Sequence, residues 1–190
     1  MTYNRTASRP AFSAADKLFH WITVLLLVVQ YSIGWLMPDV HRDTKPVGLV
    51  GLHLSVGALI VLVVLGRFVW RLMHPLPPEP EMVPRVFRTA ARVTHWLLYA
   101  LLIAFPLMGW ANASSRGWAV SLFHVVPLPP LAATGSSVGH ALGDVHKFTA
   151  WVLIALVGFH VLGALFHHLI LHDDTLRRML PRRRDQSPNR

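Results

Sequence analysis

The 190-residue sequence contains no cysteine. Its absence excludes disulfide bonds, thiolate ligation of haem iron, iron–sulfur clusters held by cysteine and the covalent attachment of c-type haem. Any haem in this protein would therefore be non-covalent, and its iron ligands would be histidine or methionine.

Charged residues are also scarce, at 14% of the chain, and four long segments contain no Asp, Glu, Lys or Arg at all. These segments are residues 19–37, 47–66, 93–113 and 148–171. Each is close to the roughly 20 residues that a helix needs to cross a bilayer. The sequence therefore predicts an all-α protein, a four-helix transmembrane bundle. The first run is too long for the apolar part of a secretion signal, about 7–15 residues, so we expect a retained helix.

Positive charge is unevenly distributed along this chain, whose net charge is +9. Only four of the eighteen Lys and Arg residues fall between the first and second or between the third and fourth charge-free segments: Arg42, Lys45, Arg116 and Lys147. The positive-inside rule then predicts that both termini and the connection between helices 2 and 3 are cytoplasmic. The charge reflects topology, so no nucleic-acid partner is expected, whereas the Arg182–Arg184 run suits anionic lipid head groups.

Turn and cap signals set the expected bounds of each element. Ser13 and Asp16 resemble a capping box, so helix 1 is expected from about residue 14 to Pro38. Helix 2 is expected to end near residue 73, before a Pro-rich connector at 75–80. Helix 3 is expected over about 85–112, an outer loop over 114–143, and helix 4 over about 144–172. We expect one bundle domain over 1–176 and a basic cytoplasmic tail over 177–190.

Five histidines lie in or beside the apolar runs: His20, His53, His95, His146 and His160. An imidazole is poorly suited to lipid, because its ring nitrogens must find partners there. A metal-centred cofactor held inside a helix bundle would explain all of them together.

The spacing of these histidines predicts two cofactor levels. His146 and His160 are separated by about 1400° of helical rotation, about 40° short of four turns, and by a rise of about 21 Å. They therefore share one face of helix 4 near opposite ends of the hydrocarbon layer. Depth pairs His53 with His146 at the outer level and His20 with His160 at the inner level. His95 is also at inner depth and competes with His20.

Gly34, Arg67 and Gly109 each lie fourteen residues after the histidine of helices 1, 2 and 3, respectively. Each therefore falls on its histidine's face at the other level. A glycine there would admit a flat macrocycle, and Arg67 could neutralise a propionate of an inner haem. The alternative is ordinary membrane-helix composition, with a snorkelling arginine at a cytoplasmic helix end. His95 is either a hydrogen-bonding histidine or a contact for a quinone or a propionate.

Several short motifs resemble those of the bacterial cytochrome b561 family, over about residues 12–184. They are Leu18-Phe19-His20-Trp21, Gly51-Leu52-His53, the segment from Arg67 to Arg71 followed by His74-Pro75-Leu76-Pro77-Pro78, Val145-His146-Lys147, Gly158-Phe159-His160 with the following Ala164-Leu165-Phe166-His167-His168, and the segment from Asp174-Thr175-Leu176 to Arg182. The resemblance implies two b-type haems with histidine on both sides of each iron, ligated by His20/His160 and His53/His146. By this resemblance His95 is not a ligand.

Electron transfer is the function that this resemblance implies. With both axial positions filled by protein, iron has no open position for oxygen chemistry, and outer-sphere electron transfer remains. The family suggests ubiquinone as a redox partner and, in some members, superoxide as a periplasmic donor, in a multi-pass protein of the bacterial inner membrane. One alternative is the cytochrome b membrane-anchor subunit of a larger complex, such as a hydrogenase or formate dehydrogenase. A non-haem metal transporter is a further alternative, which Asp or Glu inside the membrane would favour; the apolar runs contain neither.

Overall fold

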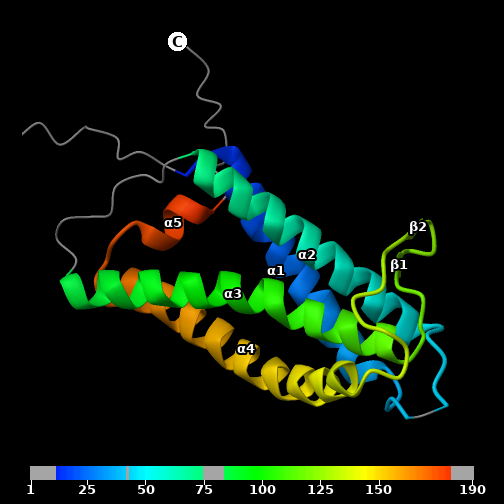
Figure 1. The fold of residues 1–190 in the computed structure, drawn as a ribbon. Helices are drawn as coiled ribbons and strands as arrows, with labels where there is room; N and C mark the ends of the chain where they lie inside the picture. The colour runs from blue at the N-terminus through cyan, green and yellow to red at the C-terminus, as the bar shows by residue number, and fades with distance from the viewer. Residues whose placement is uncertain (1–11, 42, 75–83, 181–190) are drawn as a thin grey trace, which may run out of the picture.

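The computed structural model describes residues 12–41, 43–74 and 84–180, and its main elements are five helices and one short hairpin (Figure 1). The long helices are α1 (Ala14–Leu36), α2 (Leu49–Met73), α3 (Arg85–Ser115) and α4 (Ser137–Leu169). The short helix α5 (Thr175–Met179) follows α4, and strands β1 (Ser121–Leu122) and β2 (Val126–Pro127) pair antiparallel between α3 and α4. The expected connector at 75–80, Arg42 and the Arg182–Arg184 run lie outside the described residues.

The four predicted membrane spans are confirmed, since α1 to α4 are each long and apolar enough to cross a bilayer. Many of their large apolar side chains point away from the bundle, including Phe159 at 75% exposure and Trp151 at 66%. A water-soluble monomer rarely exposes such a continuous apolar surface, whereas lipid tails solvate it. The fold is therefore an all-α, four-helix transmembrane bundle.

Helix α1 begins where its capping box predicts. The Ser13 hydroxyl accepts a hydrogen bond from the Asp16 amide at 3.1 Å, and the Ser13 amide donates to the Asp16 carboxylate at 3.0 Å. These two bonds satisfy backbone donors that the first turn of any helix leaves unpaired.

The expected start of helix 4 was wrong, because α4 begins at Ser137, seven residues before the expected Asp144. Ser136 caps it, its hydroxyl accepting from the Gly139 amide at 3.2 Å. Two glycines in this first part weaken helix propensity, but close packing against α3 requires them. An added Cβ at Gly139 would lie 2.5 Å from Ser115 Cβ, and one at Gly143 would lie 2.5 Å from Asn112 Nδ2. The outer loop is correspondingly shorter than 114–143.

The β1–β2 hairpin, which the sequence did not predict, is anchored on α2 through the buried side chain of Ser55. The Ser55 hydroxyl is 2.9 Å from the Ser121 carbonyl oxygen, and it accepts from the Phe123 amide at 3.1 Å. These bonds hold the hairpin over the start of α2, close to His53 in sequence.

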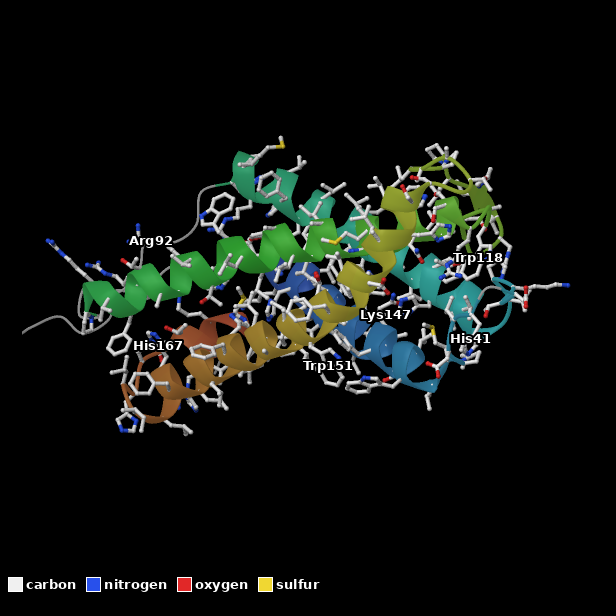
Figure 2. All side chains as sticks on the ribbon, turned by 60° about the horizontal axis from the view of Figure 1, so that its bottom comes forward. His41, Arg92, Trp118, Lys147, Trp151 and His167 are labelled. Atoms are coloured by element: carbon white, nitrogen blue, oxygen red, sulfur yellow. The ribbon has the colours of Figure 1, made fainter. Side chains whose placement is uncertain are left out.

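The helices are not equally close to one another. Helix α3 packs closely on α4 and α2, and α1 packs on α2, whereas α4 makes only sparse backbone contact with α1 and α2 among the described residues. We call the end that carries the hairpin the outer end, and the end that carries both termini of the described chain the inner end. Figure 2 shows His41 and Trp118 toward the outer end and His167 and Arg92 toward the inner end.

Helix α5 folds back against α1 at the inner end. The indole of Trp21 donates to the Met179 carbonyl at 3.0 Å, and the Lys17 ammonium donates to the Leu180 carbonyl at 3.0 Å. Helix α5 therefore spans residue 176, the expected boundary between bundle and tail.

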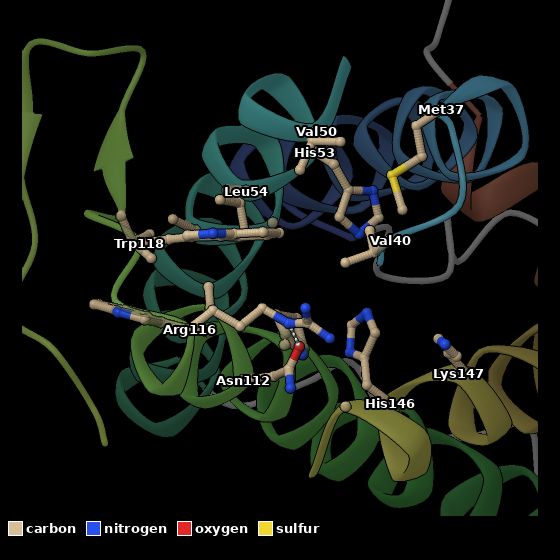
Figure 3. Close-up of a pocket in the computed structure, with 18 of the residues that line it drawn as sticks. Met37, Val40, Val50, His53, Leu54, Asn112, Arg116, Trp118, His146 and Lys147 are labelled. Atoms are coloured by element: carbon tan, nitrogen blue, oxygen red, sulfur yellow. Dashed lines mark hydrogen bonds between the residues drawn. The ribbon is translucent and has the colours of Figure 1, made fainter. Parts of the chain in front are cut away.

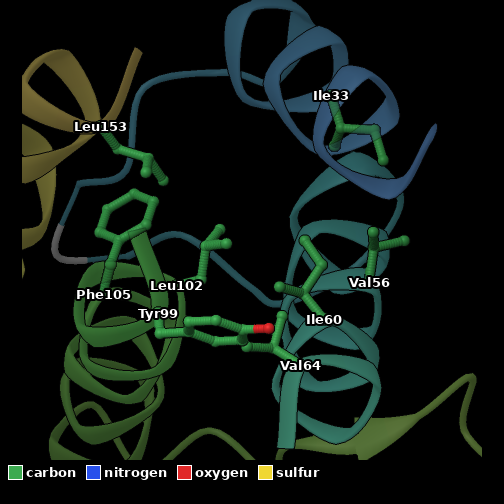
Figure 4. Close-up of a cluster of buried hydrophobic side chains, with 8 residues drawn as sticks. All are labelled: Ile33, Val56, Ile60, Val64, Tyr99, Leu102, Phe105 and Leu153. Atoms are coloured by element: carbon green, nitrogen blue, oxygen red, sulfur yellow. The ribbon is translucent and has the colours of Figure 1, made fainter. Parts of the chain in front are cut away.

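The hydrophobic core lies between the two histidine levels (Figure 4). Leu153 of α4 is fully buried and stands seven residues from both His146 and His160. Around it are grouped apolar side chains from α1, α2 and α3: Ile33, Val56, Ile60, Val64, Tyr99, Leu102 and Phe105. The hydroxyl of Tyr31 also donates to the Ala150 carbonyl at 2.7 Å, joining α1 to α4. The bundle is therefore packed at mid-height and more open at the outer histidine level, where His53 and His146 line a cavity.

Candidate haem-binding sites

The outer level brings His53 of α2 and His146 of α4 to opposite sides of a cavity (Figure 3). Their ring centres are 6.1 Å apart, and the ring planes are nearly perpendicular at 88°. A metal bound between one nitrogen of each ring, at about 2.0 Å per bond, separates the ring centres by about 6 Å. The spacing of this pair therefore fits a shared iron.

The ring of His146 is oriented by α3. Its Nδ1 is 2.9 Å from the carbonyl oxygen of Phe105, and the Phe105 ring stacks on the imidazole with centres 4.1 Å apart. When Nδ1 carries the proton and donates to this carbonyl, Nε2 is left as the nitrogen with a free lone pair. Metal-binding histidines almost always have such a second partner, which fixes the tautomer and the ring orientation.

Two glycines leave space beside the outer histidines. A Cβ added at Gly109 of α3 would lie 2.9 Å from His146 Cε1, and one at Gly34 of α1 would lie 3.6 Å from His53 Cε1. The structure thus places both glycines at the outer level, as the fourteen-residue spacing predicts. A methyl group at 109 would push His146 aside, so this glycine permits the observed ring position.

The cavity between these rings encloses about 930 Å³, including its open mouth. Its wall is mostly apolar, with Val50, Leu54 and Val61 from α2, and its charged lining residues are Arg116, Lys147 and Asp144. Arg116 is fixed by three contacts: it donates to Asn112 Oδ1 at 3.2 Å and to the His41 carbonyl at 3.1 Å, and it lies 5.4 Å from the Trp118 ring centre. A mostly apolar cavity with two cations in its lining suits a flat apolar group that carries carboxylates at one edge.

The inner level brings three imidazoles together. His20 and His160 have ring centres 6.2 Å apart, the same spacing as the outer pair. His95 is closer to His160, at 5.1 Å, and its ring is inclined at 73°. Only the His20–His160 separation matches the roughly 6 Å that two rings need on opposite sides of one metal.

Two arginines stand beside the inner histidines. The guanidinium carbons of Arg67 and Arg71 lie 5.6 and 5.7 Å from the ring centre of Tyr99. Within the described part of the chain, no carboxylate lies within ion-pair distance of either guanidinium. This pair of cations suits an anionic group entering from the inner end.

Several residues of these sites were missed at the sequence level. The Phe105 carbonyl has no sequence signal, because it depends on which turn of α3 faces His146. Tyr99 and Arg71 become relevant only when α2 and α3 pack together. Gln30 could have been noticed as an amide inside an otherwise apolar run, but it is uncharged, so a search for charged residues does not find it.

Paired imidazoles at two levels of a transmembrane bundle without cysteine define the class: a multi-pass membrane cytochrome that binds b-type haem non-covalently. A model described as prokaryotic cytochrome b561 matches residues 11–182. The chain therefore belongs to the prokaryotic cytochrome b561 family, whose members are electron-transport proteins of the bacterial inner membrane.

Curated relatives agree with this family. Cytochrome b561 homolog 2 of Escherichia coli (strain K12) is 31% identical over 182 residues, covering 95% of both chains. Probable superoxide oxidase CybB of Yersinia pestis is 31% identical over 174 residues, covering 91% of this chain and 97% of that protein. Cytochrome b562 of Cereibacter sphaeroides is 26% identical over 177 residues, covering 90% and 96%.

Proposed function

We propose that this chain is a di-haem cytochrome that carries electrons across the membrane between a donor at the periplasmic face and ubiquinone. The observation that carries the proposal is the repetition of one geometry: two facing imidazole pairs, 6.1 and 6.2 Å apart, fourteen residues apart along α4. A single haem would leave one of these pairs in the membrane without a partner.

The proposed ligands are His53 and His146 for the outer haem and His20 and His160 for the inner haem. Each haem, when bound, would be held by one of these histidine pairs and would supply a one-electron carrier. His146 is held by Phe105, so its Nε2 is aimed at the cavity. At the inner level we assign Arg67, with Arg71 beside it, to a haem propionate.

The residues of the core then separate the two haems and exclude water from the space between them. The levels are separated by a rise of about 21 Å along α4, and the intervening space is filled by Leu153, Ile60 and Leu102. Protein packing of this kind excludes water and holds both carriers at fixed separation, so electrons move without large rearrangement.

The class of donor is supported by a relative whose printed name is probable superoxide oxidase. An anionic donor of this kind would meet Arg116 and Lys147 at the outer mouth. Quinone, which is dissolved in the same membrane, is the proposed second redox partner.

The central test is haem content. Two haems per chain are expected from the pyridine haemochrome of the purified protein, extractable by acid acetone because no cysteine tethers them. His20→Ala and His160→Ala should each lose one haem, and His53→Ala should lose the other. His95→Ala should keep both, and a His41→Ala variant, altered at an exposed side chain, serves as control. One haem per wild-type chain, or haem loss in His95→Ala with retention in His20→Ala, would overturn the assignment.

We further propose that both termini are cytoplasmic, on the basis of the arginine distribution. The chain has no cysteine, so single-cysteine variants report without background. Val125→Cys at the hairpin tip, where the side chain is 79% exposed, should react with an impermeant thiol reagent in spheroplasts. Arg177→Cys in α5 should react only after the membrane is opened. The reverse pattern would invert the sides. A cytoplasmic inner end also suits contact between the basic tail and anionic lipid head groups.

A second candidate is a membrane-anchor subunit of a larger respiratory complex. It is favoured by the apolar tip of the hairpin, where Phe123, Val125 and Val126 are all exposed at the outer end. Purification in mild detergent separates the two: a stable heteromeric complex supports the anchor, and an active single-subunit cytochrome supports the first proposal.

A further inference from the structure

Gln30 is a buried amide in the middle of the membrane, and its surroundings point to the outer haem site. It is 8% exposed and lines the same cavity as His53 and His146. It stands one turn of α1 inward from Gly34, the residue beside the His53 ring. A polar side chain at this depth is costly and usually has a role.

The two polar atoms of Gln30 are in different situations. Its Nε2 donates to the main-chain carbonyl of His53 at 3.0 Å and lies 3.3 Å from the position of a Cβ at Gly57. Its Oε1 is buried and has no hydrogen-bond partner. Leaving a buried acceptor unpaired destabilises the fold, so packing of α1 against α2 does not by itself explain a glutamine here.

His53 shows the complementary feature. Its Nδ1 is also buried without a partner, whereas the Nδ1 of His146 has the Phe105 carbonyl at 2.9 Å. Gln30 and His53 thus line the same cavity, and each carries one buried polar atom without a hydrogen-bond partner. The two atoms are chemically complementary, because a protonated Nδ1 donates a hydrogen bond and an amide oxygen accepts one.

We propose that Gln30 is a positioning residue for His53 that lowers the reduction potential of the outer haem relative to the inner one. The amide oxygen places the negative end of a dipole beside the ligand, and accepting the Nδ1–H of His53 makes that imidazole more basic. Both effects stabilise ferric iron over ferrous iron. A lower outer potential directs electrons from the outer level to the inner level. This inference rests on the proposed ligation of the outer haem by His53 and His146.

The test compares redox titrations of the wild type, Gln30→Met and Gln30→Glu, with the two haems assigned by their loss in His53→Ala and His160→Ala. Methionine matches the length of glutamine but has no amide dipole. We expect Gln30→Met to favour reduction of the outer haem about threefold to tenfold, a rise of about 30 to 60 mV for one electron, with the inner haem unchanged. Ser32→Ala, which removes an exposed hydroxyl of the same helix, should shift neither haem.

Gln30→Glu keeps an acceptor oxygen and should leave the outer potential at or below that of the wild type. An unchanged outer potential in Gln30→Met, or an equal shift of both haems, would overturn the inference. If Gln30→Met loses the outer haem, the Gln30→Glu variant distinguishes the two roles. An outer potential above that of the wild type in Gln30→Glu, or loss of the outer haem in that variant as well, would make Gln30 a packing residue only. A wild type with one haem would instead contradict the proposed function.

Discussion

Phe105 contacts His146 in two different ways, through its main-chain oxygen and through its ring. The carbonyl is 2.9 Å from Nδ1, and the phenyl ring stacks on the imidazole at 4.1 Å with an angle of 17°. The hydrogen bond fixes the rotation of the imidazole, and the stacked ring limits its displacement toward α3. With Nδ1 bonded to the Phe105 carbonyl, Nε2 is the free nitrogen of His146, and it faces His53.

The first prediction concerns the glycine that faces this ring. Gly109→Ala would place a methyl group 2.9 Å from His146 Cε1, so the imidazole must shift from its position opposite His53. We expect the outer haem to be lost or to show an altered low-spin spectrum, while the inner haem is retained. The helix itself should gain about 1 kcal/mol from the better propensity of alanine.

Gly158→Ala is the matched control for this change, because a Cβ there meets nothing within 4 Å. It should keep the wild-type haem content. A normal outer haem in Gly109→Ala would show that the position of His146 does not determine haem binding.

The second prediction concerns charge at the outer mouth. Lys147 is exposed, lines the outer cavity and adjoins His146 in sequence. If it attracts an anionic donor, Lys147→Glu should slow haem reduction by that donor severalfold, most strongly at low ionic strength, where screening is weak. Stopped-flow reduction at two salt concentrations measures this effect. Equal rates at low salt, with an intact haem spectrum, would leave Lys147 as an interfacial anchor of α4.

The third prediction concerns the attachment of the hairpin. Ser55→Ala removes the buried hydroxyl that joins α2 to Ser121 and Phe123, and the Phe123 amide loses this acceptor. We expect a loss of about 1–3 kcal/mol in stability and faster proteolysis of the hairpin. Ser32→Ala should be neutral, because Ser32 is exposed and bonds only to its own helix. Unchanged protease sensitivity in Ser55→Ala would show that other contacts hold the hairpin.

The fourth prediction concerns pH and the inner end. Burial raises the pKa of Asp173, but hydrogen bonds from His167 at 2.6 Å and from the Thr175 hydroxyl and amide outweigh it and lower this pKa overall. The carboxylate therefore stabilises the fold at pH values above its unfolded pKa, and the benefit disappears as pH falls through the lower folded value. Asp173→Asn should reduce thermal stability at pH 7, and its difference from the wild type should shrink below about pH 4.

Asp174→Asn is the control for this experiment. The Asp174 carboxylate is 55% exposed, and its ion pair with Arg177 is long, at 3.9 Å. Exposed pairs of this kind contribute little. A stability difference for Asp173→Asn that stays constant from pH 7 to pH 3 would show that its effect does not come from the charged carboxylate.

The sequence alone determined the membrane fold, because the absence of charge over four segments leaves few alternatives to helices that satisfy their own backbone in lipid. It also determined that His146 and His160 share a face of α4, since helical rotation fixes this from their spacing. The start of α4 was wrong by seven residues, because Gly139 and Gly143 are weak helix formers whose packing against α3 outweighs propensity.

Only the tertiary structure decided which polar atoms meet. Three hydrogen bonds join residues at least 23 positions apart: His146 with the Phe105 carbonyl, Ser55 with Ser121, and the Gln30 amide with the His53 carbonyl. Periodicity gives the direction in which a side chain leaves its own helix. The rotation and height of the neighbouring helix, which are set by packing over the whole bundle, decide what that side chain contacts.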